Sequence, residues 1–278
     1  MQENSMPELP EVETVIRELR PVLLGRQIER IEALWPKTYV NRSKQSVKGQ
    51  HIRAVQRQGK YLIFPLDKTV LIIHLRMTGR LAFAAADRTD LEETQNLNHL
   101  RLVVHFADGS RLLFNDTRKF GRVYHVDEAK EILQNVGKDA LSEDWTPELF
   151  FKLLSGRKTG IKAFLMSQKY ISGLGNIYTD ESLFRAGIHP LRLSSSLSRK
   201  EAKRLFDAIR FILSQGVKNM GSTISDYRDA YGNPGKNQYY FKVYGREGQP
   251  CLTCGTPIEK IKAAGRSTRF CPKCQPLR

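Results

Sequence analysis

Four cysteines, all in the last 28 residues, form the clearest chemical pattern in this sequence. They occur as two Cys-x2-Cys pairs separated by 16 residues: Cys251, Cys254, Cys271 and Cys274. Each pair supplies two thiolates from one turn, and four thiolates complete the tetrahedral shell of zinc. The spacing therefore predicts one Zn²⁺ ion with a structural role, because no coordination position remains open for substrate. Disulfides or free thiols are the alternative.

Positive charge is the second signal. The 278 residues carry a formal net charge of +16, and from Lys236 onward nine Lys or Arg stand against two Glu. A protein this basic typically binds a polyanion, so we expect nucleic acid as the partner, with a surface tuned for solubility as the alternative. The sequence has no apolar run of 18 residues, and the opening MQENS does not resemble a secretion signal. We therefore expect a cytoplasmic protein with no membrane partner.

Helical spacing begins just after the segment Pro7-Glu8-Leu9. Pro10 and Glu11 suit a first helical turn. Apolar residues follow at helix spacing: Val12, Val15, Ile16, Leu19, Val22 and Leu23. The pattern predicts one amphipathic helix close to the start of the chain.

Strand signals follow this helix. Short apolar runs predict strands at 61–66, 70–77, 100–106 and 111–114, with Asp108-Gly109 as a tight turn between the last two. The polar stretch Ala84 to Asn98 predicts a long loop. The part of the chain up to about residue 135 is therefore expected to be rich in β-structure, with the helix packed on it.

Helix signals dominate the middle of the chain. Thr146-Pro147 is typical of an N-cap followed by a first-turn proline, and Ser198 to Glu201 has the form of a capping box. Residues 172–190 predict a glycine-rich turn and a short helix that ends near Gly187. Residues 220–235 predict a loop. We divide the chain into domains 1–135, 136–235 and 236–278.

Seven segments in order resemble the formamidopyrimidine-DNA glycosylase family. They are residues 6–14, Gly59 to Leu62, His74 to Gly79, Asn115 to Gly121, Gly173 to Tyr178, Val243 to Glu247, and the cysteine-rich segment with Arg266. The resemblance spans residues 6–275. It implies an α+β fold: an N-terminal β-sandwich catalytic domain with a packed helix, a helix-two-turn-helix DNA-binding domain and a C-terminal zinc ribbon. DNA is expected between two lobes.

The resemblance implies a bifunctional DNA glycosylase and abasic-site lyase, with four catalytic residues. Pro7 would attack C1′ of the damaged nucleotide through its amine, and Glu8 would act as general acid. Lys60 would contact the lesion-site phosphate and assist β-elimination. Arg266 would clamp the flanking phosphates and take part in δ-elimination. The plain alternatives are a turn proline for Pro7, helix charge compensation for Glu8 and a solvated lysine for Lys60.

The resemblance also implies a DNA-binding surface. Met77, Arg118 and Phe120 would fill the gap that an extruded nucleotide leaves. For Met77 and Phe120 the alternative is packing in a core. Ser222 and Thr223 would lie in a loop over the damaged base. Further expected DNA contacts are His74, His99, Arg157, Asn176, Tyr244 and Lys260. For His74 a partly buried, hydrogen-bonded histidine is the alternative.

One feature departs from the family pattern. The family nucleophile is an N-terminal proline, whereas MQENSM precedes Pro7 here. An acylated proline nitrogen is an amide and cannot form an iminium ion. We expect translation to begin at Met6, whose removal exposes the Pro7 amine.

The expected substrate is double-stranded DNA with an oxidised purine (8-oxoguanine or a formamidopyrimidine) or an abasic site. We expect a monomeric, nucleoid-associated bacterial protein. A catalytically inactive homologue that binds lesions, a glycosylase for oxidised pyrimidines of the endonuclease VIII type and a zinc-ribbon module without repair function are the alternatives.

Overall fold

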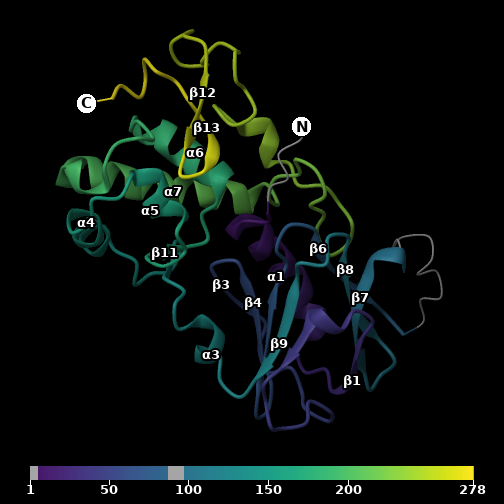
Figure 1. Ribbon diagram of the computed structural model, residues 1–278. Helices are drawn as coiled ribbons and strands as arrows, with labels where there is room; N and C mark the ends of the chain where they lie inside the picture. The colour runs from purple at the N-terminus through teal and green to yellow at the C-terminus, as the bar shows by residue number, and fades with distance from the viewer. Residues whose placement is uncertain (1–5, 87–96, 278) are drawn as a thin grey trace. The chain divides into compact units, whose positions relative to one another are not determined.

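In the computed structural model, which describes residues 6–86 and 97–277, contacts group the chain into two units (Figure 1). The first unit contains residues 1–135 and 219–236. The second unit contains residues 136–218 and 237–278. Residues 219–235, which were expected in the helical domain 136–235, group with the first unit instead. Among the described residues, none of the helices has the length and apolar character needed to cross a membrane.

Helix α1 (Leu9–Leu23) begins where the sequence predicts it. Glu8 is its N-cap, and the Glu8 backbone nitrogen donates a 2.9 Å hydrogen bond to Glu11 Oε2, one half of a capping box. Pro10 lies in the first turn, where the helix does not need its missing N–H. The predicted apolar face is buried: Leu9, Val12, Val15, Ile16, Leu19 and Leu23.

Two sheets pack with α1 around one core. The first has the order β1 (Ile28–Ala33), β7 (Leu100–Phe106), β8 (Arg111–Asp116) and β6 (Gly79–Ala84). The second has the order β2 (Tyr39–Asn41), β9 (Arg122–Val126), β5 (Val70–His74), β4 (Tyr61–Pro65) and β3 (Gln56–Gln58). Buried side chains of both sheets and of α1 belong to a single apolar cluster. This shared core makes the unit the predicted β-sandwich with a packed helix.

The turns of the sandwich follow the sequence, with one correction. Gly109 joins β7 to β8 with a φ of 83°, as the Asp-Gly signal predicts. The strand predicted at 70–77 is too long: β5 ends at His74, and Arg76 adopts a φ of 59°. A turn closes there because the Gly79 nitrogen donates to the Leu75 carbonyl at 3.0 Å. Of the predicted loop Ala84–Asn98, residues 87–96 lie outside the described residues.

Short elements complete the first unit. They are the 3-10 helices η1 (Pro36–Thr38) and η2 (Leu97–His99) and the helix α3 (Lys130–Leu133). The segment 220–235 contains neither helix nor strand, as predicted.

The second unit begins with helices that end at the predicted signals. Thr146 caps α4 (Pro147–Ser155) by accepting from the Leu149 nitrogen at 3.2 Å. Gly187 ends α6 (Asn176–Ala186) in the left-handed conformation, with φ 62°. Ser198 and Glu201 form the predicted capping box of α7 (Arg199–Lys218). Helices α6 and α7 pack together, and 3-10 helix η3 (Ser194–Ser196) lies in the connection between them.

The remaining elements of the second unit are small. Strands β10 (Lys138–Asp139) and β11 (Ile171–Ser172) pair in parallel. Helices α4 and α5 (Ile161–Met166) come between them in the sequence. The 3-10 helix η4 (Asn237–Tyr240) precedes the hairpin of β12 (Glu259–Ala263) and β13 (Arg266–Phe270), drawn in yellow in Figure 1. Strand β13 contacts α6, so the hairpin belongs to the same unit as the helices.

Candidate functional site

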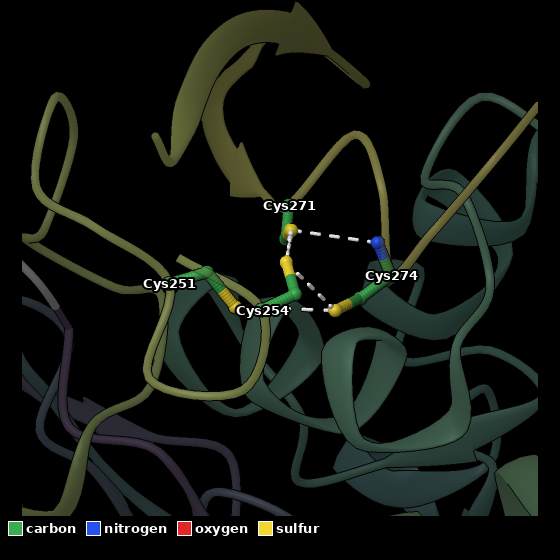
Figure 2. Close-up of side chains that lie close together, drawn as sticks. All are labelled: Cys251, Cys254, Cys271 and Cys274. Atoms are coloured by element: carbon green, nitrogen blue, oxygen red, sulfur yellow. Dashed lines mark hydrogen bonds between the residues drawn. The ribbon is translucent and has the colours of Figure 1, made fainter. Parts of the chain in front are cut away.

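The four cysteines converge on one point. Figure 2 shows their sulfur atoms facing one another. The Sγ–Sγ distances are 3.9 Å for Cys251 and Cys274, 3.4 Å for Cys254 and Cys271, and 3.5 Å for Cys254 and Cys274. These distances are too long for a disulfide bond. Four ligands about 2.3 Å from a central zinc are about 3.8 Å from one another, close to the observed values. The donor set therefore fits one structural zinc ion, and the disulfide alternative is excluded for these four residues.

A tight turn presents Arg266 at the tip of the β12–β13 hairpin. Ala263 pairs with Arg266, and the two residues between them, Ala264 and Gly265, have φ values of 51° and 69°. Two left-handed residues form the type I′ turn that fits the twist of a hairpin. The Arg266 side chain is exposed to solvent. The turn thus holds an exposed guanidinium on a short, well-defined strand.

A buried ion pair connects this hairpin to the helices of its unit. Lys162 Nζ lies 2.6 Å from Asp180 Oδ1 and donates to Thr268 Oγ1 at 2.7 Å. Asp180 Oδ2 accepts from the Arg269 nitrogen at 3.0 Å. Lys162 and Asp180 are each 1% exposed. Because unpaired buried charges are costly, β13 is held where it completes this network.

Asn176 and Arg157 both contact groups within the second unit. Asn176 is the first residue of α6, and its Nδ2 donates to the Ser267 carbonyl at 3.1 Å, next to the Arg266 turn. The Arg157 guanidinium lies 4.1 Å from the centre of the Tyr170 ring. The DNA contacts predicted for both residues stay predictions.

Tyr244 and Lys260 differ sharply in exposure. Tyr244 is 5% exposed, with the Arg269 guanidinium 4.8 Å from its ring centre. Lys260 is exposed and pairs with Glu247 at 3.4 Å. Glu181, which is 3% exposed, accepts hydrogen bonds of 2.9 to 3.1 Å from the backbone nitrogens of residues 242–244. Burial raises the pKa of the Glu181 carboxyl, and these three donors oppose the rise.

Pro7 and Glu8 lie at the N-terminal end of α1, in the first unit. Both are buried, and Glu8 is 2% exposed. Glu11 connects this end of the helix to the segment 219–236, because its Oε1 accepts from the Ser222 nitrogen at 2.7 Å while its Oε2 accepts from Glu8. The structure therefore brings the predicted nucleophile and general acid close in space to the predicted damaged-base residue Ser222.

The segment 219–236 is also ordered by its own hydrogen bonds. Thr223 Oγ1 donates to the Tyr227 carbonyl and accepts from the Gly235 nitrogen, both at 2.9 Å. Further along, Glu18 of α1 accepts from the Ala230 nitrogen at 2.8 Å. Burial, together with the nearby Asp229 carboxyl, raises the pKa of Glu18 to about 7.

Lys60 and His74 are both buried in the first unit. Lys60 follows Gly59 in the two-residue turn between β3 and β4 and is 4% exposed, so the alternative of a solvated lysine is wrong. His74 is 5% exposed, packs edge-on against Tyr61 with ring centres 4.6 Å apart, and accepts from the Arg76 nitrogen at 3.0 Å. Burial lowers the pKa of His74 to about 3, helped by the charges of Arg76 and Lys60, so its ring is neutral. These contacts match the alternative of a buried, hydrogen-bonded histidine.

Met77, Arg118 and Phe120 lie on two turns at one end of the four-stranded sheet. Phe120 is 48% exposed, which excludes the core-packing alternative for this residue, and Met77 is partly exposed. The Arg118 guanidinium lies 5.2 Å from the centre of the Phe120 ring. His99 lies 3.4 Å from Arg101, measured between Nδ1 and the nearest guanidinium nitrogen. Arg118 and Phe120 are thus exposed and Met77 is partly exposed, which is compatible with insertion into DNA.

Sequence patterns do not identify the buried charged residues that hold the predicted site residues in place. A charged side chain is ordinarily a surface residue, so residue type does not distinguish the buried ones: Asp116, Lys162, Asp180 and Glu181. Of the four, Asp116 alone lies within one of the family motifs, Asn115 to Gly121. Their partners are up to 106 residues away along the chain, so spacing alone carries no signal for them.

Known families match this chain along most of its length. Residues 6–123 match the family model described as Formamidopyrimidine-DNA glycosylase N-terminal domain, and residues 136–228 match the H2TH domain of the same enzyme. Residues 248–277 match the zinc finger found in FPG and IleRS.

Individual relatives agree with these matches. A formamidopyrimidine-DNA glycosylase of Herpetosiphon aurantiacus is 44% identical over 97% of this chain and 100% of the relative. Two solved structures of Lactococcus lactis Fpg are each 38% identical and cover 98% of this chain and 100% of theirs. One is a mutant in complex with a Fapy-dG containing DNA, with a TM-score of 0.87. The other is the wild-type protein with an oxidized pyrimidine containing DNA, with a TM-score of 0.85.

Proposed function

Because this chain belongs to the formamidopyrimidine-DNA glycosylase family, we propose that it is a DNA glycosylase and abasic-site lyase that removes oxidised purines from duplex DNA. The observation that carries this proposal is the contact of Glu11 with both Glu8 and Ser222, which joins the N-terminal end of α1 to the segment assigned to the damaged base. Nucleophile, acid and base-binding loop then act on one extruded nucleotide.

The reaction begins with the amine of Pro7. Its lone pair forms a bond to C1′ of the deoxyribose, the glycosidic bond breaks, and the electron pair leaves with the base, which takes up a proton. An α-amine titrates near pH 8, so a useful fraction is neutral at physiological pH. A secondary amine then gives an iminium ion, which acts as an electron sink for the following eliminations. This step requires the Pro7 nitrogen as a free amine and not as the amide that Met6 forms.

Three other residues handle protons and phosphates. Glu8 protonates the sugar ring oxygen as the ring opens, which its buried position supports. Lys60 assists β-elimination, in which a proton leaves C2′ and the 3′ phosphate departs. Arg266 clamps phosphates beside the lesion through its exposed guanidinium and accompanies δ-elimination, in which the 5′ phosphate departs.

The remaining residues bind DNA. Met77, Arg118 and Phe120 fill the gap in the duplex, and Ser222 and Thr223 lie over the damaged base. His74, His99, Arg157, Asn176, Tyr244 and Lys260 are proposed as further contacts. The zinc ion holds the ribbon that carries Arg266, and its four ligands leave it no part in the chemistry. We place the monomeric enzyme at the bacterial nucleoid, where its substrate is.

Oxidised pyrimidines are a second candidate substrate. The observation that favours them is the wild-type Lactococcus lactis relative in complex with an oxidized pyrimidine containing DNA. Relative excision rates for 8-oxoguanine, formamidopyrimidine and 5-hydroxycytosine in one duplex sequence decide between the two substrate classes.

Borohydride trapping tests the proposal. A protein that begins at Pro7 is expected to form a stable covalent adduct with a duplex containing an abasic site, and peptide mapping should locate it at Pro7. The same protein with Met6 retained is the matched control and should give no adduct. An adduct at Lys60 would reassign the nucleophile, and no adduct from the protein that begins at Pro7 would refute the lyase chemistry.

A further inference from the structure

The Met77 turn and the Arg118–Phe120 turn leave the same end of one sheet. Strand β6 begins at Gly79, β8 ends at Asp116, and these two residues are partners in the antiparallel register. Residues 75–78, before β6, and residues 117–121, after β8, therefore extend side by side from the same end of the sheet. Groups that fill one gap in a duplex have to arrive together, so the relative position of these two turns matters.

A single buried carboxylate lies between the two turns. Asp116 is 1% exposed. Its Oδ1 accepts from the Thr78 hydroxyl in the first turn and from the Arg118 nitrogen at 3.1 Å in the second, while its Oδ2 accepts from the Gly121 nitrogen at 2.7 Å. Thr78 Oγ1 also accepts from the Arg118 nitrogen, at 3.1 Å. Both turns are thus hydrogen-bonded to the same side chain.

The surroundings leave this arrangement little freedom. A Cβ at Gly121 would come within 2.3 Å of the Phe114 ring and 3.1 Å of Asp116 Oδ2, so only glycine permits the approach. The Asp116 carbonyl accepts from Arg101 Nε at 2.9 Å, and Arg101 in turn contacts His99. The buried Asp116 carboxylate thus bonds to Arg118 and to the chain neighbours of Met77 and Phe120, Thr78 and Gly121. Its backbone carbonyl is connected to His99 through Arg101.

We propose that Asp116 is a positioning residue that fixes the Met77 turn and the Arg118–Phe120 turn in one geometry for insertion into the duplex. The inference rests on the proposed function, since it concerns how a nucleotide is extruded. Side chains that are ordered beforehand do not lose conformational freedom when they enter the DNA. A loosened pair of turns must be ordered during extrusion, and excision from a duplex then slows.

Asp116→Asn removes one acceptor and keeps the shape of the side chain. Its amide group meets an N–H of Gly121 or Arg118, so one hydrogen bond to a turn is lost. Removing a buried hydrogen bond to a charged group slows a step that depends on it by about tenfold or more. We expect that loss in single-turnover excision of 8-oxoguanine from a duplex. Borohydride trapping on a single-stranded oligonucleotide with an abasic site, which has no gap to fill, should stay within about twofold.

A second pair of variants distinguishes a specific effect on the two turns from a general destabilisation of the fold. Thr78→Val removes the hydroxyl that joins the turns, whereas Thr78→Ser keeps it; only the valine variant should slow duplex excision. Asp108→Asn is the matched control, because this aspartate caps the turn at the opposite end of the same hairpin by accepting from the Ser110 nitrogen at 3.0 Å. It should leave both rates unchanged.

Insertion can be followed without chemistry. The fluorescence of 2-aminopurine opposite a tetrahydrofuran abasic-site analogue reports how far the bound protein unstacks the partner base. Asp116→Asn and Thr78→Val should reduce the rise seen with the unsubstituted protein. Equal rises, or equal losses on duplex and single-stranded DNA, would overturn the inference. If the unsubstituted protein does not excise 8-oxoguanine, the proposed function fails, and the fluorescence still decides the role of Asp116.

Discussion

Glu11 Oε1 accepts a 2.7 Å hydrogen bond from the backbone nitrogen of Ser222, 211 positions later in the chain. The other oxygen of the same carboxylate accepts from the Glu8 nitrogen. Gly221 allows the approach, since a Cβ there would come within 2.9 Å of Glu11 Oε1. One side chain therefore fixes the start of α1 and the segment 219–236 relative to each other.

Glu11→Gln should destabilise the protein and slow base excision. The glutamine oxygen can still accept a hydrogen bond from the Ser222 nitrogen. The glutamine NH2 group then faces the Glu8 N–H, and because both are donors, the hydrogen bond to Glu8 is lost. Loss of this capping interaction costs about 1 to 2 kcal/mol of unfolding free energy, which urea titration measures. Excision of 8-oxoguanine should fall more than cleavage at a preformed abasic site, where no base has to be held. Glu29→Gln, at an exposed glutamate beside Arg30, should change stability by less than about 0.5 kcal/mol.

Glu18→Gln should make stability less dependent on pH. The pKa of Glu18 is raised to about 7 in the folded protein, against about 4.3 in an unfolded chain. Between these values the folded state binds more protons, so its stability falls as pH rises towards 7. Glutamine still accepts from Ala230 and does not titrate, so the fall in unfolding free energy between about pH 5 and pH 7.5 should become shallower. Glu143→Gln, on the surface, should leave the pH profile unchanged; a profile equally unchanged in Glu18→Gln would contradict the prediction.

Arg266→Ala should weaken binding to duplex DNA and reduce its salt dependence. Loss of one phosphate contact lowers the slope of log K against log salt by about 1. Arg266→Lys should keep the slope but bind less tightly, because lysine cannot make a bidentate contact. Lys130→Ala, an exposed lysine of α3, is the control. Titrations at several salt concentrations give both quantities; an unchanged slope in Arg266→Ala would rule out the clamp.

Zinc analysis should find one metal ion per chain. The four sulfur atoms lie within 4.8 Å of one another, room for a single ion. Removal of zinc with a chelator, or Cys271→Ser, should reduce duplex binding, because the hairpin with Arg266 loses its anchor. Elemental analysis beside a DNA titration checks this. A zinc-free protein with full affinity would separate the metal from DNA binding.

Local signals predicted the main helices and four strands of the sandwich, β4, β5, β7 and β8, but not β1, β2, β3, β6 and β9. The helix after Pro7, the turn at Gly109, the caps at Thr146 and Ser198 and the end of α6 at Gly187 all match the structure. Each depends on residues within a few positions of one another. The apolar run predicts a strand over 70–77, whereas β5 ends at His74. Apolar residues continue into the turn in which Arg76 has a positive φ, so hydrophobicity alone does not mark the end of the strand.

Long-range contacts were beyond prediction. Family motifs drew attention to Pro7, Lys60 and Arg118 as site residues, and their roles stay proposals. The burial of Lys60 and the contact between Glu11 and Ser222 depend on how distant segments pack. A motif names the residues of a site, whereas the side chains that orient them are recognised only from the folded chain.

The ion pair of Lys162 and Asp180 has a consequence for synthesis on the ribosome. Both residues are made about a hundred positions before the β13 residues that complete their hydrogen bonds, Thr268 and Arg269. Until those residues emerge, the nascent chain carries two charged groups whose burial is incomplete. A chain that stops before β13 would leave Lys162 and Asp180 without these partners, and we expect such a chain to be degraded faster than one that contains β13.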